Sequence, residues 1–199
     1  MAFQPALLLT AADVERRELS AGAWVDVARG FAGPEADGVF CRLVDAVPWQ
    51  AQRRSMYDRV VDVPRLVRFY DEGEPLPDPA LVQWREQLNE RYSPALGEAL
   101  VTTGLCYYRD GRDSVAWHGD TIGRARLHDT VVAIVSLGAE RKLALRPVDG
   151  GASIALRVSH GDLVVMGGSC QRTWQHAVPK TSRVVGPRIS VQFRPLGVR

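Results

Sequence analysis

Hydrophobic residues recur at helical spacing in two stretches of the first half of the chain, 33–47 and 78–100. An Asp-Pro pair opens the second stretch, which is a typical helix start. The spacing predicts two helices, each with one face in the core, and core packing explains the stripe over 78–100 without any cofactor. The stripes consist of Val39, Phe40, Leu43, Val44 and Val47, and of Leu81, Trp84, Leu88 and Tyr92.

After residue 100 the pattern changes to short β-rich segments separated by Gly, Pro and charged residues. Many short strands at close spacing favour an antiparallel sandwich or barrel. We therefore expect a mostly β (α+β) fold, a jelly roll or double-stranded β-helix with the N-terminal helices packed on one sheet. The predicted strands are 104–108, 130–138, 141–147, 153–158, 162–168, 173–178 and 188–194. We expect a single domain over 1–199, with a helical part over 1–100 and the jelly-roll core over 101–199.

Composition narrows the class of protein. The 199 residues are 46% hydrophobic and 24% charged, which is ordinary for a soluble globular chain. Cys41, Cys106 and Cys170 form no CxxC pair, which argues against a disulfide framework or a zinc finger. No apolar run has the length of a signal peptide or a membrane span, so we expect a reduced, cytoplasmic setting.

Charge is uneven along the chain although the net charge is only +2. Such basic clusters suit a polyanionic partner, and they equally suit a solvated face. They lie at 52–59, 64–68, 123–127 and 180–188.

The triplet His-Gly-Asp occurs twice, at 118–120 and at 160–162. Residues i and i+2 of an extended segment point the same way, so either triplet can aim an imidazole and a carboxylate at one point. A third ligand must come from elsewhere. Two histidines and one carboxylate form the facial triad that suits non-haem Fe(II).

Spacing favours the first triplet. His176 lies 56 positions beyond Asp120 (176 − 120), a separation that can bring opposite strands of a barrel together. The second triplet is little more than one strand away from His176 and sits between two apolar runs, so Gly161 and Asp162 are typical of a turn. We expect His128, beside Asp129, on the surface.

The segment 188–194 alternates between polar and apolar residues. Arginines facing a core are costly unless an anion pairs with them, and a bidentate carboxylate is their natural partner. Together with a metal triad this indicates a carboxylate co-substrate; an edge strand with its polar face in water is the alternative. The polar positions are Arg188, Ser190, Gln192 and Arg194.

Several segments in this half of the chain resemble the AlkB-type family of Fe(II)- and 2-oxoglutarate-dependent dioxygenases. The resemblance covers roughly 105–195, and PRLVRFYDEGE (64–74) extends it more weakly. The matching segments are YYRDGRDSVAWHGD (107–120), AIVSLG (133–138), HGDLVVMGG (160–168), WQHAVP (174–179) and PRISVQFR (187–194).

The resemblance implies the site residues one by one. His118, Asp120 and His176 match the iron ligands. Arg188 and Tyr108 match the residues that bind the far carboxylate of 2-oxoglutarate. Arg194 matches an arginine near the carboxylate that chelates iron, and Ser190 lies on the co-substrate side of the same strand. The second triplet falls in a turn without a metal role.

The chain departs from the family pattern at three places. Cys106 stands where members often have an asparagine, and a thiol cannot fully replace an amide donor. Ser190 and Gln192 stand where the pattern has Asn and Thr. Thr121 and Ile122 stand where some nucleic-acid-repairing members have an acidic residue, which leaves the choice of substrate open.

The implied function is oxidative demethylation of N-alkylated bases in DNA or RNA, with Fe(II), 2-oxoglutarate and O2, by a monomer without a membrane or an obligate protein partner. The region 48–75 matches a nucleotide-recognition lid. Candidate substrate contacts are Arg53, Arg54, Tyr57, Arg65, Tyr70 and Trp117. The same oxidation of a protein or small molecule, and a non-catalytic nucleic-acid-binding module, are the alternatives.

Overall fold

The computed structural model describes residues 14–56, 59–120 and 127–198; for 53–56 and 59–62 it describes the backbone alone. The strands are β1 (Glu15–Glu18), β2 (Ala23–Ala28), β3 (Gln50–Met56), β4 (Arg59–Tyr70), β5 (Leu100–Tyr108), β6 (Val115–His118), β7 (Val132–Gly138), β8 (Arg141–Pro147), β9 (Ile154–Val158), β10 (Leu163–Gly168), β11 (Trp174–Val178) and β12 (Arg188–Pro195). The α-helices are α1 (Ala36–Ala46), α2 (Pro79–Leu96) and α3 (Cys170–Thr173).

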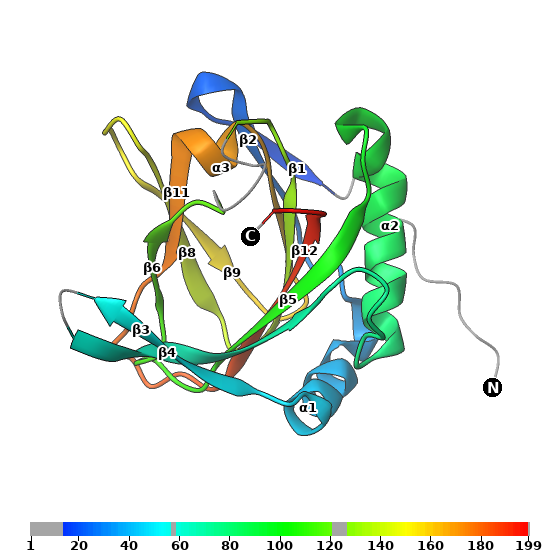
Figure 1. Ribbon diagram of the computed structural model, residues 1–199, viewed down its shortest axis with the longest axis vertical. Helices are drawn as coiled ribbons and strands as arrows, with labels where there is room; N and C mark the ends of the chain where they lie inside the picture. Colours follow the sequence, from blue (N-terminus) through cyan, green and yellow to red (C-terminus); the bar gives the residue numbers. More distant parts are fainter. Residues whose placement is uncertain (1–13, 57–58, 121–126, 199) are drawn as a thin grey trace.

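Two antiparallel sheets form the body of the molecule (Figure 1). The larger has the order β1-β2-β10-β7-β12-β5-β4-β3, and the smaller has the order β6-β11-β8-β9. One buried cluster joins the sheets, with Ile134 and Met166 from the larger packed together with Leu145 and Trp174 from the smaller. This arrangement is the expected jelly-roll core.

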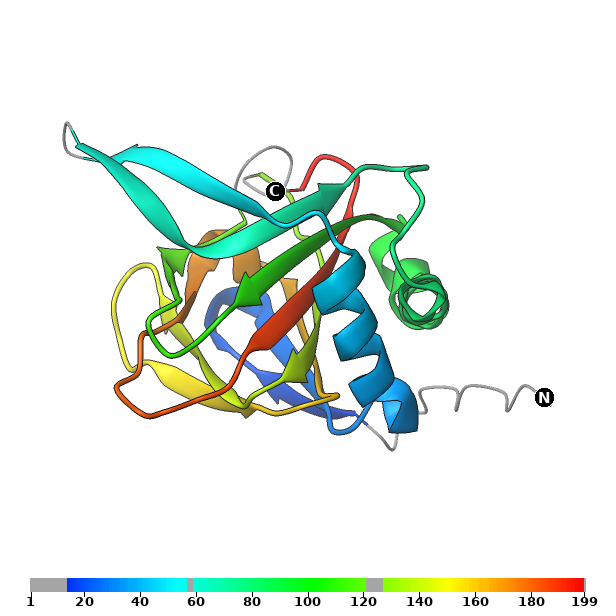
Figure 2. The same cartoon turned by 90° about the horizontal axis from the view of Figure 1, so that it is seen from below.

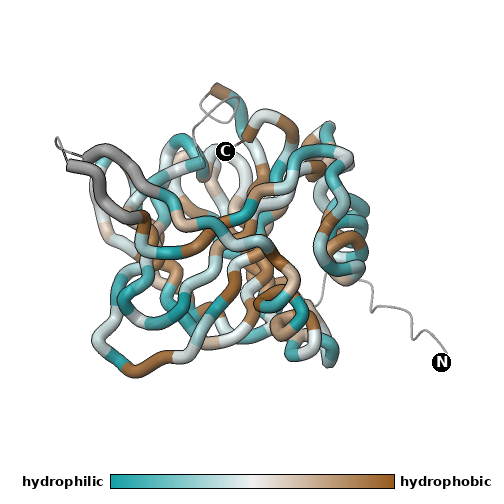
Figure 3. The backbone as a smooth tube through the Cα atoms, turned by 60° about the horizontal axis from the view of Figure 1, so that its bottom comes forward, coloured by the Kyte–Doolittle hydropathy of each residue, from teal (hydrophilic) through white to brown (hydrophobic). Residues whose placement is uncertain are grey.

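Helices α1 and α2 cover the other face of the larger sheet (Figure 2). Their apolar stripes, including Leu43, Leu81 and Leu88, join a second buried cluster with Val135 and Ile189 of the sheet. Figure 3 shows the amphipathic character of α2, whose tube changes between hydrophobic and hydrophilic along its length. The predicted packing of N-terminal helices on one sheet is confirmed.

Local chemistry sets the ends of α2. Asp78 precedes the helix and accepts a hydrogen bond from the Ala80 amide at 2.9 Å, and Pro79 occupies the first turn. Gly97 ends the helix in the left-handed conformation, with φ 74°. The predicted boundary at residue 100 is therefore too late, because Leu100 already begins β5.

The expectation of a helical part over 1–100 is wrong, because β1–β4 lie in it and belong to the larger sheet. Their sequences hide the pattern: β1 is the charged segment ERRE with all four residues exposed, and β4 carries arginines and Pro64 between its apolar positions. β4 pairs with β5 only from Leu66 to Tyr70, and its earlier residues pair with β3 alone. No helix in the described parts of the chain is long and apolar enough to cross a membrane.

Candidate metal centre

Three possible metal ligands meet at one end of the smaller sheet. β6 and β11 are antiparallel neighbours, and His118 is directly opposite His176 in their register. The two imidazole rings lie 4.2 Å apart between centroids. Asp120 follows β6 by two residues, and one ligand atom from each of the three side chains lies within 4.8 Å of the others.

Asp120 is held from two sides. Its Oδ2 accepts a hydrogen bond from Arg194 Nε at 2.8 Å, and its backbone amide donates to Gln171 Oε1 at 3.0 Å. Burial by itself raises the pKa of this carboxyl, but the positive charge and the hydrogen bond of Arg194 outweigh it, and the pKa is lowered to about 2. Asp120 is therefore a carboxylate at neutral pH and is oriented before any ligand arrives.

The histidines are arranged as neutral nitrogen donors. Burial, with a smaller contribution from His118, lowers the pKa of His176 to about 3, so this ring carries no proton charge at neutral pH. His118 Nδ1 lies 2.8 Å from the Ala116 carbonyl oxygen, so it donates there and leaves Nε2, which is 3.8 Å from Asp120 Oδ1, free to bind. Two neutral imidazoles and one carboxylate fit Fe(II), with further coordination positions open.

Arg188 lies buried in the same interior. It begins β12, between Tyr108 of β5 and Gly138 of β7, and only 2% of its surface is exposed. Its Nε donates to Ser136 Oγ at 2.9 Å, whereas its buried Nη1 has no partner in the parts of the chain that the structure describes. Burial lowers the pKa of this guanidinium, so an anion would relieve a real cost.

Tyr108 supplies a neutral donor beside this arginine. The guanidinium carbon of Arg188 lies 5.2 Å from the ring centroid. Burial raises the pKa of the Tyr108 hydroxyl to about 12, so the hydroxyl keeps its proton at neutral pH. A buried cation with an open nitrogen, next to a phenol that can donate, fits one carboxylate group of a dicarboxylate such as 2-oxoglutarate.

The alternation of β12 divides its residues between two environments. Ile189, Val191 and Phe193 are buried under the helices, whereas Arg188, Ser190, Gln192 and Arg194 are buried between the sheets. β12 lies in the middle of the larger sheet, between β7 and β5. The alternative of a solvated edge strand is therefore wrong.

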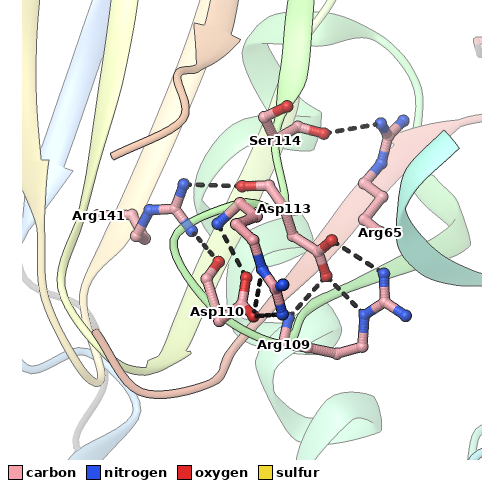
Figure 4. A network of polar contacts seen from close by, with 7 residues as sticks. Arg65, Arg109, Asp110, Asp113, Ser114 and Arg141 are labelled. Atoms are coloured by element: carbon pink, nitrogen blue, oxygen red, sulfur yellow. Dashed lines mark hydrogen bonds and ion pairs between the residues drawn. The ribbon is translucent and has the colours of Figure 1, made fainter. Parts of the chain in front are cut away.

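The loop between β5 and β6 is fastened to its surroundings by arginines (Figure 4). Arg141 is 4% exposed and donates to the carbonyl oxygens of Asp110, Asp113 and Pro179 at 2.8 to 3.1 Å. Arg65 of β4 donates more weakly, at 3.4 Å, to the Ser114 carbonyl oxygen. These contacts fix the segment that carries Tyr108 at one end and His118 at the other.

The second triplet has a structural role. Gly161 has φ 79°, which favours glycine, and Asp162 accepts hydrogen bonds from the amides of Gly30 and Ser159. His160 Nδ1 accepts from the Gly138 amide at 2.8 Å. The prediction that this triplet forms a turn is thus confirmed, and so is the exposed position of His128.

Comparison with known proteins agrees with this geometry. Residues 36–194 match the family described as the 2OG-Fe(II) oxygenase superfamily. The chain belongs to this superfamily. Its cofactors, named in that description, are those that the triad and Arg188 fit.

The curated proteins that this chain resembles include relatives of the AlkB type. The chain is 32% identical over 183 residues to alpha-ketoglutarate-dependent dioxygenase alkB homolog 3 of Bos taurus, covering 80% of this chain and 61% of the relative. It is 25% identical over 185 residues to DNA oxidative demethylase ALKBH2 of Homo sapiens, covering 83% and 70%. The chain thus spans about three fifths of the first of these relatives.

A solved structure supports the fold. The 2OG-Fe(II) oxygenase family oxidoreductase from Burkholderia pseudomallei superposes with a TM-score of 0.61 over 85% of this chain and 84% of that one. The two sequences are only 11% identical, so this likeness concerns the fold alone.

The structure places the candidate substrate contacts in different surroundings. Tyr70 is 5% exposed and packs in the cluster under the helices, on the face of β4 that points away from the metal centre. Trp117 lies on the face of β6 opposite His118, with its ring 4.4 Å below the Arg146 guanidinium, and so lies away from the metal centre.

Three other candidates lie where side chains are not described. These are Arg53, Arg54 and Tyr57, and Thr121 and Ile122 likewise fall outside the described residues. Arg65 is half-buried, and it is close enough to Cys106, Tyr108 and Asp120 for their charges to raise its pKa despite its burial. Among the candidates whose side chains are described, Arg65 is the one that faces the interior of the site.

Sequence reasoning missed three residues that shape the site. Ser136 binds Arg188, Gln171 binds the Asp120 amide, and Arg141 fastens the β5–β6 loop. Each contacts a residue far away in the sequence: 52 positions for Ser136, 51 for Gln171 and 28 for Arg141 and Asp113. No local pattern around them signals such a partner.

Proposed function

We propose that this chain is an Fe(II)- and 2-oxoglutarate-dependent dioxygenase that oxidatively demethylates N-alkylated bases in nucleic acid. One observation carries the proposal: the triad of His118, Asp120 and His176 and the unpartnered, buried Nη1 of Arg188 belong to one interior between the two sheets. A metal with open positions and a carboxylate-binding arginine are the two parts that this chemistry needs.

Each residue has a definable task in the reaction. His118, Asp120 and His176 would hold the iron, and Arg188 with Tyr108 would bind the far carboxylate of 2-oxoglutarate. When bound, the iron and the keto acid supply the oxidation of a C–H bond by O2, with succinate and CO2 as by-products. A hydroxylated N-methyl group then leaves as formaldehyde and restores the base.

Arg194 acts through Asp120. Its Nε–Oδ2 hydrogen bond of 2.8 Å keeps the carboxylate charged and fixes the direction of the second oxygen, Oδ1, toward His118. The buried surroundings keep bulk water away from this pair. Arg194 is therefore a positioning residue for the metal ligand.

The choice of nucleic acid as substrate rests on the relatives and on one part of the fold. The relatives include a protein named DNA oxidative demethylase. The β3–β4 hairpin extends beyond the body of the molecule (Figure 2), and Arg65 connects it to the site. A base must leave the stack to reach a buried metal, and a projecting basic hairpin can hold the surrounding backbone.

Mass spectrometry of a single-stranded oligonucleotide with one N-methylated adenine or cytosine tests the proposal. Incubation with the protein, Fe(II), ascorbate and 2-oxoglutarate should remove one methyl group, and omission of 2-oxoglutarate should prevent this. Asp120→Asn should abolish the reaction. Asp162→Asn, the same change in the second triplet, serves as the matched control and should remain active at temperatures where it stays folded.

Other outcomes would separate the alternatives. Succinate formation without any loss of the methyl group would leave the oxygenase chemistry and exclude this substrate, in favour of a protein or small molecule. Oligonucleotide binding that does not respond to iron or to Asp120→Asn, without turnover, would contradict the proposal and favour a non-catalytic binding module.

A further inference from the structure

We propose that Gln192 is a positioning residue that holds Arg194 on the metal ligand Asp120 and supplies the side-chain amide that Cys106 lacks. This inference rests on the proposed function, because it assumes that 2-oxoglutarate binds between Arg188 and the metal. It assigns a role to the two places where β5 and β12 depart from the family pattern.

A continuous set of hydrogen bonds runs from the middle of β12 to the metal centre. Gln192 Oε1 accepts from Arg194 Nη2 at 2.9 Å, and Arg194 Nε donates to Asp120 Oδ2 at 2.8 Å. On its other side, Gln192 Nε2 donates to Ser190 Oγ at 3.1 Å and lies 3.5 Å from Cys106 Sγ. The Gln192 amide thus fixes Nη2 of Arg194, while Nε of the same guanidinium fixes the Asp120 carboxylate.

The facing strand provides the space that this arrangement needs. In the register of β5 and β12, Gln192 is opposite Gly104 and Ser190 is opposite Cys106. A Cβ atom at Gly104 would lie 2.9 Å from Arg194 Nη1 and 3.2 Å from Gln192 Oε1, closer than such contacts normally are. The long glutamine therefore fits because both residues across from it are small.

The chain carries a side-chain amide on β12, opposite a thiol-bearing strand β5. Where the family pattern has an asparagine on β5, this chain has Cys106, and where the pattern has a threonine on β12, it has Gln192. The carboxamide of Gln192 contacts the Cys106 thiol, so it occupies the space beside the position where an asparagine amide would begin. The four side chains of this arrangement, those of Cys106, Ser190, Gln192 and Arg194, are each less than one tenth exposed.

Binding of 2-oxoglutarate to the full-length, Mn(II)-loaded protein, measured by titration calorimetry without turnover, tests the inference. Gln192→Ala should weaken binding by about tenfold or more, because a charged hydrogen bond that orients Arg194 is lost. Gly104→Ala should weaken it in the same direction by displacing Arg194. Gln175→Ala is the matched control, since Gln175 accepts from Arg146 at 2.8 Å on the outer side of β11, and should change binding less than about twofold.

A double substitution separates this role from a merely structural one. Gln192→Thr alone should weaken binding, and Cys106→Asn added to it should restore most of the affinity, because β5 then carries the amide. Equal affinity of Gln192→Ala and the unaltered protein, or no difference between Gln192→Thr and the double variant, would overturn the inference. Failure of the unaltered protein to bind 2-oxoglutarate would instead contradict the proposed function on which it rests.

Discussion

Arg188 and Arg141 are two buried arginines beside the same tyrosine ring, and their replacement should have opposite consequences. Their guanidinium carbons lie 5.2 and 5.7 Å from the centroid of Tyr108. Arg188 donates from Nε to Ser136, and its buried Nη1 has no hydrogen-bond partner among the described residues. Arg141 satisfies three backbone carbonyl oxygens.

The stability effects follow from these partners. Arg188→Met removes one hydrogen bond worth about 1 kcal/mol, and the relief from burying an unpaired charge offsets this loss. The ligand-free variant should therefore be as stable as the unaltered protein or more so. Arg141→Met takes the guanidinium donor from the carbonyl oxygens of Asp113 and Pro179, and leaves that of Asp110 with the Asp113 amide at 3.3 Å. It should lower the free energy of unfolding by about 3 kcal/mol, or roughly 6–12 °C in Tm.

For 2-oxoglutarate binding, Arg188→Met should have the larger effect and Arg141→Met the smaller. Removal of a buried charge from a carboxylate partner typically costs about 2–5 kcal/mol, so Arg188→Met should weaken 2-oxoglutarate binding between roughly thirty-fold and several thousand-fold. Thermal unfolding with Mn(II), with and without 2-oxoglutarate, measures both effects. The ligand should raise the Tm of Arg141→Met and leave that of Arg188→Met unchanged. A ligand-free Arg188→Met as unstable as Arg141→Met, or one still stabilised by 2-oxoglutarate, would refute this reasoning.

Three further predictions concern other parts of the chain. Asp162→Ala should cost about 2–4 kcal/mol in urea unfolding, because the amides of Gly30 and Ser159 lose their acceptor, and calorimetry should still find one Mn(II) per chain. Because the folded pKa of His176 is depressed to about 3, the unfolded state binds the proton first, and metal-free stability should fall by about 3 kcal/mol between pH 6.5 and 4. In urea unfolding, the free energy of unfolding of His176→Gln should fall less over this pH range. A fall as large as in the unaltered protein would exclude His176 as its cause. Trp117→Ala should leave the Kd of 2-oxoglutarate unchanged in calorimetry, since its ring lies on the outer side of β6.

The sequence predicted the jelly-roll half of the fold because its strands are buried on at least one face. β8 is a clear case, since its bounds are those predicted and its apolar residues Leu143, Ala144 and Leu145 are buried. β1 and β3 were missed because they are the edge strands of the larger sheet, and the four exposed charged residues of β1 leave no alternation. β4 lies next to β3 and pairs with β5 only from Leu66 to Tyr70. The sequence also missed β2, which lies inside the sheet between β1 and β10, so edge position does not account for every missed strand. Alternation of polar and apolar residues reflects the burial of one face of a strand, and an edge strand such as β1 has no buried face.

The predicted site residues divide in the same way. The metal triad could be predicted because His-x-Asp on an extended segment has a fixed direction, and β6 and β11 then place His118 opposite His176. Tyr70 and Trp117 were assigned to the substrate by residue type, whereas strand alternation points both away from the interior. The supporting residues Ser136 and Gln171 depend on strand order and register, which no local pattern contains.

The central claim is that His118, Asp120 and His176 hold one metal ion that is required for 2-oxoglutarate to bind beside Arg188. Calorimetric titration of the metal-free protein, first with Mn(II) and then with 2-oxoglutarate, tests it most directly. The account predicts one Mn(II) per chain, 2-oxoglutarate binding that requires the metal, and loss of both in an Asp120→Ala variant that still unfolds cooperatively. Undiminished Mn(II) and 2-oxoglutarate binding by a folded Asp120→Ala variant would contradict it.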